Sequence, residues 1–237
     1  MKLQGRVAIV TGAGRGIGRS IARTLAAEGS SVALAARTER EILEVRTEIE
    51  AAGGTALCVR TDVSREDDVA HLFDEVLKRF GRLDILVNNA GIGFFAPLRE
   101  LTLEQFERMW RVNVVGTFLC SQRGARMMEE RGEGTIVNIS SLAGKNAFTG
   151  GSGYAATKWA LMGLSNCLRL EVRHANVRVI TVCPGSVQTD FSPHADDPAK
   201  EGRILVPQDV ADAVLHAVTA PARAMVSEID IRPTNPR

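Results

Sequence analysis

The sequence predicts an α/β fold in which helices cover both faces of a seven-stranded parallel sheet. Short, β-branched apolar runs alternate with longer amphipathic stretches along all 237 residues, which is the pattern of strand–helix–strand units with right-handed crossovers. Most of the runs are apolar on both faces, as strands covered from both sides must be. No linker rich in Pro or Ser divides the chain. Residues 1–237 are therefore predicted to form a single domain with a doubly wound Rossmann fold.

The apolar runs place seven strands, at residues 7–11, 32–36, 56–60, 84–88, 135–140, 177–182 and 224–231. Helices are expected where apolar residues recur at the helical period, at 17–29, 39–54, 65–81 and, as longer helices, near 103–130 and 154–173. Glycines are expected to end the first three helices, at Gly29, Gly53 and Gly81. Ser64 and Thr102 are expected to cap the starts of later helices.

The composition excludes several classes of partner. Lys and Arg total 29 against 28 Asp and Glu, so a net charge of +1 offers no general attraction for nucleic acid or an anionic membrane. The four cysteines have no C-x-x-C spacing and the four histidines form no H-x-x-x-H pair, so no metal site is expected. No apolar run suits a signal peptide or a membrane helix. A cytoplasmic protein with a small-molecule partner is predicted.

A glycine-rich turn follows the first predicted strand. Residues 11–18, TGAGRGIG, match T-G-x-x-x-G-x-G but not G-x-G-x-x-G, since Ile17 stands three residues after Gly14. Glycines at such a turn let the backbone approach a pyrophosphate, whose charge the free amides of the next helix bind. Ligands of doubly wound sheets bind beyond the carboxyl ends of the strands. The turn therefore predicts a dinucleotide site at that edge.

The second predicted strand ends in a basic residue. Ala36 and Arg37 stand where NAD-dependent enzymes of this fold carry an acid for the ribose 2′-hydroxyl, and Arg15 lies in the glycine turn. Two guanidinium groups suit a 2′-phosphate, which they can bind through paired hydrogen bonds. The pattern predicts NADP(H), while Glu39 and Glu41 keep NAD(H) as an alternative.

Seven motifs in order resemble the short-chain dehydrogenase/reductase family over nearly the whole chain: TGAGRGIG, TDV at 61–63, NNAG at 88–91, Asn113, the serine of NISS, Tyr154 with Lys158, and CPGSVQT at 183–189. The resemblance implies an NADPH-dependent oxidoreductase that interconverts a ketone or aldehyde and an alcohol. It implies that the catalytic residues are Asn113, Ser141, Tyr154 and Lys158.

The resemblance also implies a set of cofactor-binding residues. Asp62 would bond the adenine amino group, and Thr189 would reach the nicotinamide carboxamide. Asn88 would be partly structural. The full set is Gly12, Gly14, Arg15, Gly16, Ile17, Gly18, Arg37, Asp62, Val63, Asn89, Ala90, Gly91, Tyr154, Lys158, Pro184, Gly185, Val187 and Thr189.

Tyr154 is the only tyrosine of the chain and stands four residues before Lys158, so the two side chains share a face of the predicted helix. An ammonium about 4 Å away would lower the pKa of the phenol by up to about 3 units, less whatever desolvation takes back. The family resemblance implies that Asn113 holds a water that links Lys158 to bulk solvent.

The catalytic serine is either Ser140 or Ser141. The family places its serine 13 residues before the tyrosine, and 154 minus 13 is 141. Adjacent residues of a strand face opposite ways, so only one of the two hydroxyls faces the site. Ser141 is the preferred residue, with Ser140 as a structural hydroxyl at the strand end.

Four phenylalanines are expected around the substrate: Phe94, Phe95, Phe148 and Phe191. They suit an apolar or aromatic carbonyl compound, although packing explains them equally well. The chain departs from bacterial 3-oxoacyl-acyl carrier protein reductases after about residue 190, with a short lid at 190–206 and no glycine pair near its end. A general carbonyl reductase is therefore preferred, and a 3-oxoacyl-acyl carrier protein reductase of fatty acid synthesis is the alternative.

Two further classes are disfavoured. A non-catalytic NADP sensor would usually lack the Ser, Tyr and Lys set, and a sugar-nucleotide epimerase would carry a larger C-terminal region. A homodimer or homotetramer through the helices near 103–130 and 154–173 is expected from the resemblance. Its apolar contacts, or equally residues of the subunit's own core, would be Met109, Trp110, Val114, Phe118 and Cys120.

Overall fold

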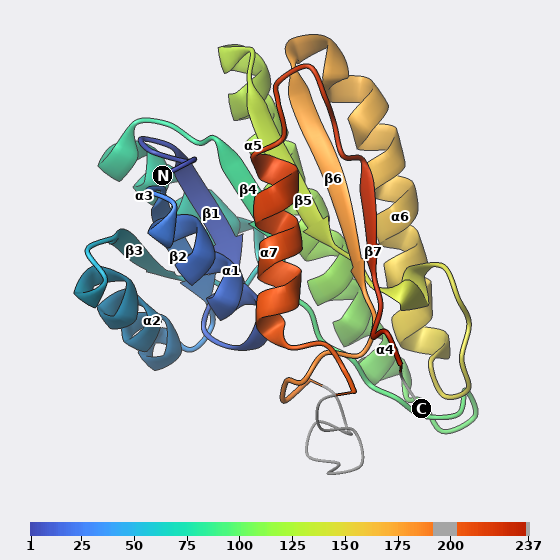
Figure 1. Ribbon diagram of the computed structural model, residues 1–237. Coiled ribbons are helices and arrows are strands. Elements are labelled where there is room, and N and C mark those ends of the chain that lie inside the picture. Colours follow the sequence, from blue (N-terminus) through green and yellow to red (C-terminus); the bar gives the residue numbers. More distant parts are fainter. Residues whose placement is uncertain (192–202, 236–237) are drawn as a thin grey trace.

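A parallel sheet of seven strands runs through the centre of the molecule (Figure 1). The structure is a computed structural model and describes residues 1–191 and 203–235. The strand order is β3-β2-β1-β4-β5-β6-β7, and every neighbouring pair is parallel. The strands are β1 Val7–Thr11, β2 Ser31–Ala36, β3 Thr55–Arg60, β4 Ile85–Asn88, β5 Gly134–Ile139, β6 Val177–Pro184 and β7 Glu228–Ile231. The predicted doubly wound α/β fold is confirmed.

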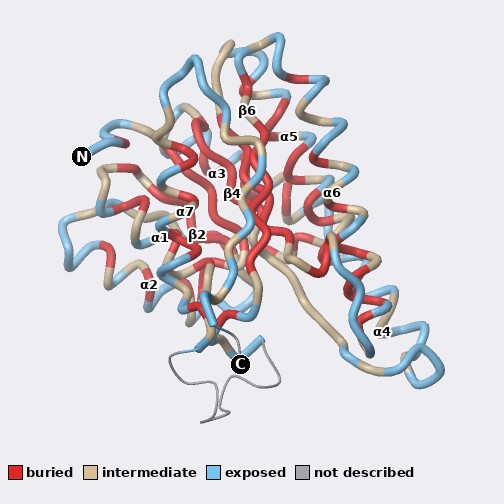
Figure 2. Tube along the Cα trace, turned by 45° about the vertical axis from the view of Figure 1, so that its right-hand side comes forward, coloured by how far each residue is buried: buried red, intermediate tan, exposed pale blue. Residues whose placement is uncertain are grey.

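Helices cover both faces of this sheet. Their bounds are α1 Gly16–Ala27, α2 Glu39–Ala51, α3 Glu66–Phe80, α4 Leu103–Met109, α5 Gly116–Arg131, α6 Ser152–Val172 and α7 Pro207–Val218. Short one-turn segments lie at Leu142–Gly144 and Arg173–Ala175. Helices α1, α2 and α7 contribute to one apolar core, while α3, α5 and α6 contribute to another. Figure 2 shows the buried residues concentrated along the strands between these two layers.

Strand alternation explains the two cores. In β1, Ala8 and Val10 pack into the core beneath α1, α2 and α7, whereas Val7 and Ile9 pack into the core on the other face. All four side chains are 4% exposed or less, so both faces of the strand are buried. Burying one such side chain contributes about 1.5–3 kcal/mol, which is why these strands read as continuous apolar runs.

The predicted helix ends are mostly as expected. Gly29, Gly53 and Gly81 follow α1, α2 and α3 with φ of +93°, +81° and +72°, a region that favours glycine. Thr102 forms a capping box with Gln105 at the start of α4. Ser64 is not an N-cap: α3 is capped at Arg65, because the Ser64 hydroxyl donates to the Asp62 carboxylate at 2.7 Å.

The last strand is shorter than the sequence predicts. Residues 224–227 are not part of β7, which pairs only with the second half of β6, from Thr181 to Pro184. Beside the first half of β6, the Arg178 guanidinium instead donates to the carbonyl oxygens of Val218 and Ala220, each at 3.0 Å. These bonds tie the end of α7 to β6.

The segment predicted as a lid, 190–206, lies mostly outside the described residues, which include only 190–191 and 203–206 of it. At its base, Gln188 N donates to Leu205 O at 2.8 Å and Leu205 N donates to Ser186 O at 3.0 Å. Within the described ranges, no helix has both the length and the apolar character that crossing a membrane requires.

Candidate active site

A cleft of about 1380 Å³ opens at the carboxyl ends of the strands, where the segments that follow all seven strands meet. Every residue predicted to bind the cofactor lines this cleft except Gly18. Of the other predicted residues, Ser141, Phe95, Phe148 and Phe191 line it, whereas Asn113 and Phe94 do not. The topology therefore brings together residues that are far apart in the sequence.

The glycine turn is packed too closely for side chains. Gly12 has a φ of +64°, and a Cβ built on it would lie 2.9 Å from the Cα of Ala90. A Cβ on Gly18 would lie 2.2 Å from the carbonyl oxygen of Gly12, so Gly18 packs the start of α1 against β1 instead of facing the cleft. The first turn of α1 lines the cleft, and its amides lack partners within the helix. This arrangement suits a bound pyrophosphate.

The segment after β4 is fastened to the glycine turn through Thr11. The Thr11 hydroxyl accepts hydrogen bonds from the amides of Asn89 and Ala90, each at 3.0 Å. Asn88 is buried and donates from Nδ2 to Asn138 Oδ1 at 2.8 Å and to Ser121 Oγ at 2.9 Å. Asn89 and Ala90 thus reach the cleft, while Asn88 links β4 to β5 and α5.

Charged residues of both signs stand beside the glycine turn. Arg15 and Arg37 are exposed and line this end of the cleft. Arg15 Nη1 lies 3.4 Å from Asp190 Oδ2, which belongs to the segment after β6. The carboxylate of Glu41 folds over the turn, since a Cβ built on Gly14 would lie 2.7 Å from Glu41 Oε2. Two arginines and one glutamate therefore line the part of the cleft where the adenosine ribose is predicted to bind.

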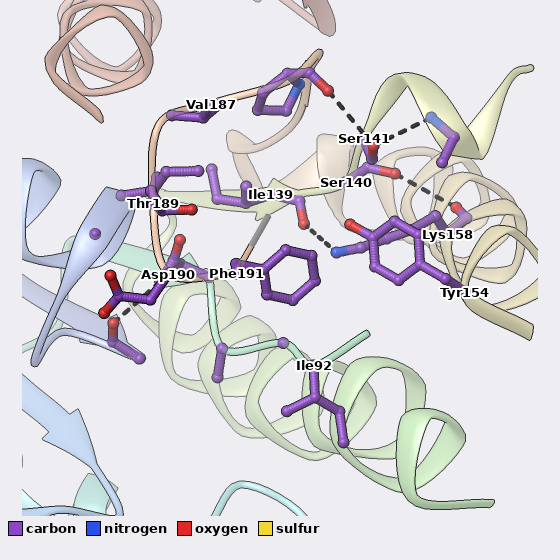
Figure 3. A pocket seen from close by; sticks show the side chains of 18 of the residues that line it. Ile92, Ile139, Ser140, Ser141, Tyr154, Lys158, Val187, Thr189, Asp190 and Phe191 are labelled. Atoms are coloured by element: carbon purple, nitrogen blue, oxygen red, sulfur yellow. Dashed lines mark hydrogen bonds between the residues drawn. The ribbon is translucent and has the colours of Figure 1, made fainter. Parts of the chain in front are cut away.

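Tyr154 lies deep in the other half of the cleft, near the start of α6 (Figure 3). It is 8% exposed, and the rings of Phe95 and Phe191 lie at centroid distances of 5.3 and 5.6 Å. Burial raises the pKa of Tyr154 to about 12, although a hydrogen bond with Ser141 acts in the opposite direction. The predicted lowering of this pKa is therefore wrong, because loss of hydration outweighs the hydrogen bond with Ser141.

Lys158 lies one helical turn further along α6, with Nζ 5.6 Å from the centroid of the Tyr154 ring. It is 5% exposed, and Nζ donates to the main-chain oxygen of Ile139 at 2.9 Å. Burial lowers the pKa of Lys158 to about 8. Burial therefore makes the amine less basic than an exposed lysine.

The two adjacent serines make different contacts. Ser141 Oγ accepts from the amide of Ala143 at 3.1 Å and donates to the carbonyl oxygen of Pro184 at 3.4 Å. Ser140 Oγ donates to the main-chain oxygen of Lys158 at 3.4 Å. Ser141 thus lies beside the phenol, and Ser140 joins β5 to the backbone of α6 (Figure 3).

Asn113 lies in a π-helical turn, Trp110–Val115, that joins α4 to α5. Its Nδ2 donates to Ile92 O at 2.9 Å and to Thr157 Oγ1 at 3.0 Å, while Oδ1 accepts from Ile92 N at 2.8 Å. The side chain is therefore used to join the segment after β4 to α6, and it does not face the cleft. The predicted water relay stays a prediction. It would have to use the main-chain carbonyl, which also accepts from Thr117 Oγ1 at 2.8 Å.

Three of the four predicted phenylalanines form an aromatic wall around Tyr154. The Phe95 ring lies 6.1 Å from those of Phe148 and Phe191. Phe94 points elsewhere, with the Arg108 guanidinium 5.4 Å from its ring centroid. Phe94 packs against the small core of Met109, Ala143, Tyr154 and Ala155 and does not line the cleft, so its role as a substrate residue stays a prediction.

Sequence reasoning missed Arg232 and Pro233, which line the cleft after β7. They belong to no motif, but the rule that ligands meet the carboxyl ends of strands applies to the last strand as well as to the first. That position was the only signal that pointed to them. In the described ranges, no cluster of three or more His, Cys, Asp or Glu residues could hold a metal ion.

Residues 6–200 match the family model described as short chain dehydrogenase. The chain belongs to the short-chain dehydrogenase/reductase family. This oxidoreductase is 35% identical over 236 residues to sepiapterin reductase of Chlorobaculum tepidum, covering 97% of this chain and 96% of that protein.

Two solved structures of other proteins are also similar to this dehydrogenase/reductase. A metagenomic short-chain oxidoreductase in complex with NADP is 40% identical, with a TM-score of 0.87 and 99% of each chain covered. A 7α-hydroxysteroid dehydrogenase complexed with NADH and 7-oxo glycochenodeoxycholic acid is 32% identical, with a TM-score of 0.92 and 98% of this chain and 95% of that chain covered.

Proposed function

We propose that this protein is an NADPH-dependent oxidoreductase that interconverts a ketone or aldehyde and an alcohol, with Tyr154 as general acid and base. The observation that carries the proposal is the meeting of Tyr154, Ser141 and Lys158 in one half of a cleft whose other half holds the glycine turn. A buried phenol with a hydroxyl partner suits proton transfer, and a glycine turn at a helix N-terminus suits a dinucleotide.

The residues present fit a nicotinamide dinucleotide. The glycine turn would hold the pyrophosphate, and Asp62 and Val63 would lie beside the adenine. Thr189 would hold the carboxamide. The cofactor, when bound, supplies or accepts the hydride, so the protein has to provide orientation and the proton.

The proton is the part of the reaction assigned to this chain's own residues. During reduction, the Tyr154 hydroxyl gives its proton to the carbonyl oxygen while the carbonyl carbon receives the hydride. Ser141 donates a hydrogen bond to the same oxygen and stabilises the negative charge that develops there. Lys158, one turn away, stabilises the resulting phenolate and returns a proton to it.

Cofactor preference is assigned to the charged residues beside the glycine turn. Arg15 and Arg37 would bind a 2′-phosphate and favour NADPH. Glu41 lines the cleft and would repel that phosphate, whereas Glu39 does not line it. NADPH is therefore proposed as the preferred cofactor, with measurable use of NADH.

The substrate is proposed to carry an apolar or aromatic group next to its carbonyl. Phe95, Phe148 and Phe191 offer it a wall of rings at 5.3–6.1 Å spacings around Tyr154. Aromatic side chains gain by edge-to-face and offset contacts with a planar ligand.

The test is NADPH consumption by the purified protein with a panel of ketones and aldehydes that includes aryl ketones and a 3-oxoacyl thioester. Carbonyl-dependent oxidation of NADPH supports the proposal. Turnover confined to the thioester would favour the 3-oxoacyl reductase instead. Tight NADPH binding without turnover of any compound would contradict the proposal and favour a non-catalytic sensor.

A homodimer or homotetramer is proposed through the helical run α4–α5 and through α6. Phe118 and Trp159 are 44% and 54% exposed on these helices. A groove of about 340 Å³ between α5 and α6 is lined by Phe118 and Leu164, among others. Met109 and Cys120, which the sequence analysis considered for the same contacts, are fully buried in the subunit's own core instead.

A further inference from the structure

A strip of charged side chains runs along β7 toward the cleft. Alternate residues of a strand share a face, as Glu228 and Asp230 do in β7, and Arg232 follows directly after the strand, which ends at Ile231. Lys145, from the segment after β5, pairs through Nζ with the carboxylates of both Glu228 and Asp230. Arg232 Nη2 donates to Asp230 Oδ2 at 3.2 Å. Asp230 is thus shared between a lysine inside the strip and an arginine at its end.

The end of this strip lies next to the proposed catalytic serine. Gly185 N donates to Ile231 O at 2.8 Å, and the preceding residue, Pro184, accepts from Ser141 Oγ at 3.4 Å. A Cβ built on Gly185 would lie 3.3 Å from both the Leu142 side chain and the Pro233 ring. Figure 1 shows the chain leaving β7 at the same edge of the sheet where β5 and β6 end. Arg232 therefore enters the cleft on its serine side.

The Arg232 guanidinium keeps capacity for a ligand. Its side chain is 55% exposed, and its bond to Asp230 uses one nitrogen of a group with five N–H donors. Lys158 is another charged residue of the cleft lining, and it is buried. The remaining charged lining residues belong to the cofactor half of the cleft and are Arg15, Arg37, Glu41, Asp62 and Asp190. Among described lining residues, Arg232 is thus the exposed cation on the serine side.

The cleft lining offers a second donor, Asn146. Asn146 also lines this part of the cleft, and its Nδ2 donates one hydrogen to Leu142 O at 3.1 Å. The same nitrogen carries a second hydrogen. A guanidinium and an amide donor that line the same cleft can both donate to a carboxylate.

We propose that the cleft contains a carboxylate-binding subsite in which Arg232, oriented by Asp230, pairs with an acidic group of the substrate. The inference rests on the proposed function and narrows its substrate class. The substrate is a carbonyl compound with an apolar or aromatic body against the phenylalanine wall and a carboxylate at Arg232.

A matched pair of substrates tests the subsite. 4-Acetylbenzoate and its methyl ester present the same aryl ketone with and without a negative charge. The wild-type protein is expected to show a higher kcat/KM for the acid than for the ester. Arg232→Met should lower kcat/KM for the acid by about 10- to 100-fold, which is the effect of losing a charged hydrogen bond. The same variant should change kcat/KM for the ester little. Arg232→Lys should retain part of the preference.

Arg223→Met is the control variant, because Arg223 is an exposed arginine in the segment that leads into β7 at its other end. It should leave the preference for the acid unchanged. Equal kcat/KM values of wild type for acid and ester, or an unchanged preference in Arg232→Met, would overturn the subsite.

Calorimetric titration of benzoate into the protein with NADP+ separates this inference from the proposed function. Benzoate binding that Arg232→Met abolishes, in a protein that reduces no carbonyl compound, would retain the subsite and refute the reductase. Failure of benzoate to bind the wild-type protein, together with turnover of neutral ketones alone, would refute the subsite and retain the reductase.

Discussion

Tyr154 and Lys158 are both buried, and burial moves their pKa values in opposite directions. The pKa of the phenol rises to about 12 and that of the amine falls to about 8, so both shifts favour the uncharged form. A neutral phenol is the form that donates a proton to a carbonyl oxygen. Burial thus keeps Tyr154 in the neutral form that the proposed reduction would use.

Tyr154→Phe removes the proton donor and keeps the ring that packs between Phe95 and Phe191. We expect turnover to fall by about 10²- to 10⁴-fold, the contribution of one general acid. The dissociation constant for NADPH, measured by fluorescence titration, should stay within a few-fold of wild type. Turnover near the wild-type value would remove Tyr154 from the proposed mechanism.

Arg37→Asp and Glu41→Gln should move cofactor preference in opposite directions. Arg37→Asp is expected to weaken NADPH binding by about 10- to 100-fold through loss of a charge-assisted bond. Glu41→Gln should strengthen NADPH binding, because it removes a negative charge beside the 2′-phosphate. Titrations with NADPH and NADH measure both effects. Glu44→Gln is the control, because Glu44 is exposed on α2 and does not line the cleft. If neither test variant changes the ratio of the dissociation constants for NADPH and NADH, the adenosine ribose lies elsewhere.

At the scale of elements, a buried carboxylate ties strands together at the end of the sheet opposite the cleft. The Asp84 side chain is 2% exposed and precedes β4. It accepts hydrogen bonds of 2.8 Å from the amide of Val7, from Arg6 Nη1 and from Arg82 Nε. Arg6 and Arg82 also contact Glu133, which precedes β5. One acid thus links the beginnings of β1, β4 and β5.

Asp84→Asn should lower the free energy of unfolding by about 3 kcal/mol, because it leaves buried donors without a charged partner. Urea denaturation measures the loss. Asp74→Asn, at an exposed position of α3, should change stability little. If Asp84→Asn lowers the free energy of unfolding no more than Asp74→Asn does, the hydrogen bonds of Asp84 make no net contribution to stability.

The same carboxylate predicts a pH dependence. Burial by itself would raise the pKa of Asp84, but hydrogen bonds from Arg82, Arg6 and Val7 lower it overall below its ordinary 3.8. The unfolded chain therefore takes up this proton at a higher pH than the folded protein does. The contribution of Asp84 to the free energy of unfolding is complete above pH 3.8 and is lost as the pH falls through its lowered folded-state pKa. The free energy of unfolding of Asp84→Asn should therefore fall less steeply with decreasing pH in this range than that of the wild-type protein.

On the scale of the whole molecule, the cleft, the Asp84 cluster and the exposed aromatic residues lie on different parts of the described surface. The cleft occupies the carboxyl ends of the strands, the Asp84 cluster occupies their amino ends, and exposed aromatic residues lie on α5 and α6 at the side. Large aromatic side chains that remain exposed on neighbouring helices are typical of contact surfaces.

Phe118→Glu should dissociate the proposed oligomer, because a charge would have to be buried at the contact. Analytical ultracentrifugation is expected to show a smaller species than wild type. Leu77→Glu is the matched control, since Leu77 is 42% exposed on α3, away from these helices. A wild-type protein that sediments as a monomer would refute the assembly outright.

The sequence by itself determined the strands, the helices and most of the lining of the cleft, because periodicity, glycine turns and motif spacing are local properties. The parallel, doubly wound character of the sheet follows from the same local units, whereas the order of its seven strands is seen only in the structure. Only the tertiary structure decided which side chains meet. It turned Asn113 and Phe94 away from the cleft, raised the pKa of Tyr154 by burying it, and brought Arg232 to the serine side. Burial and contact between distant segments depend on how the whole chain packs, and no single stretch of sequence carries that information.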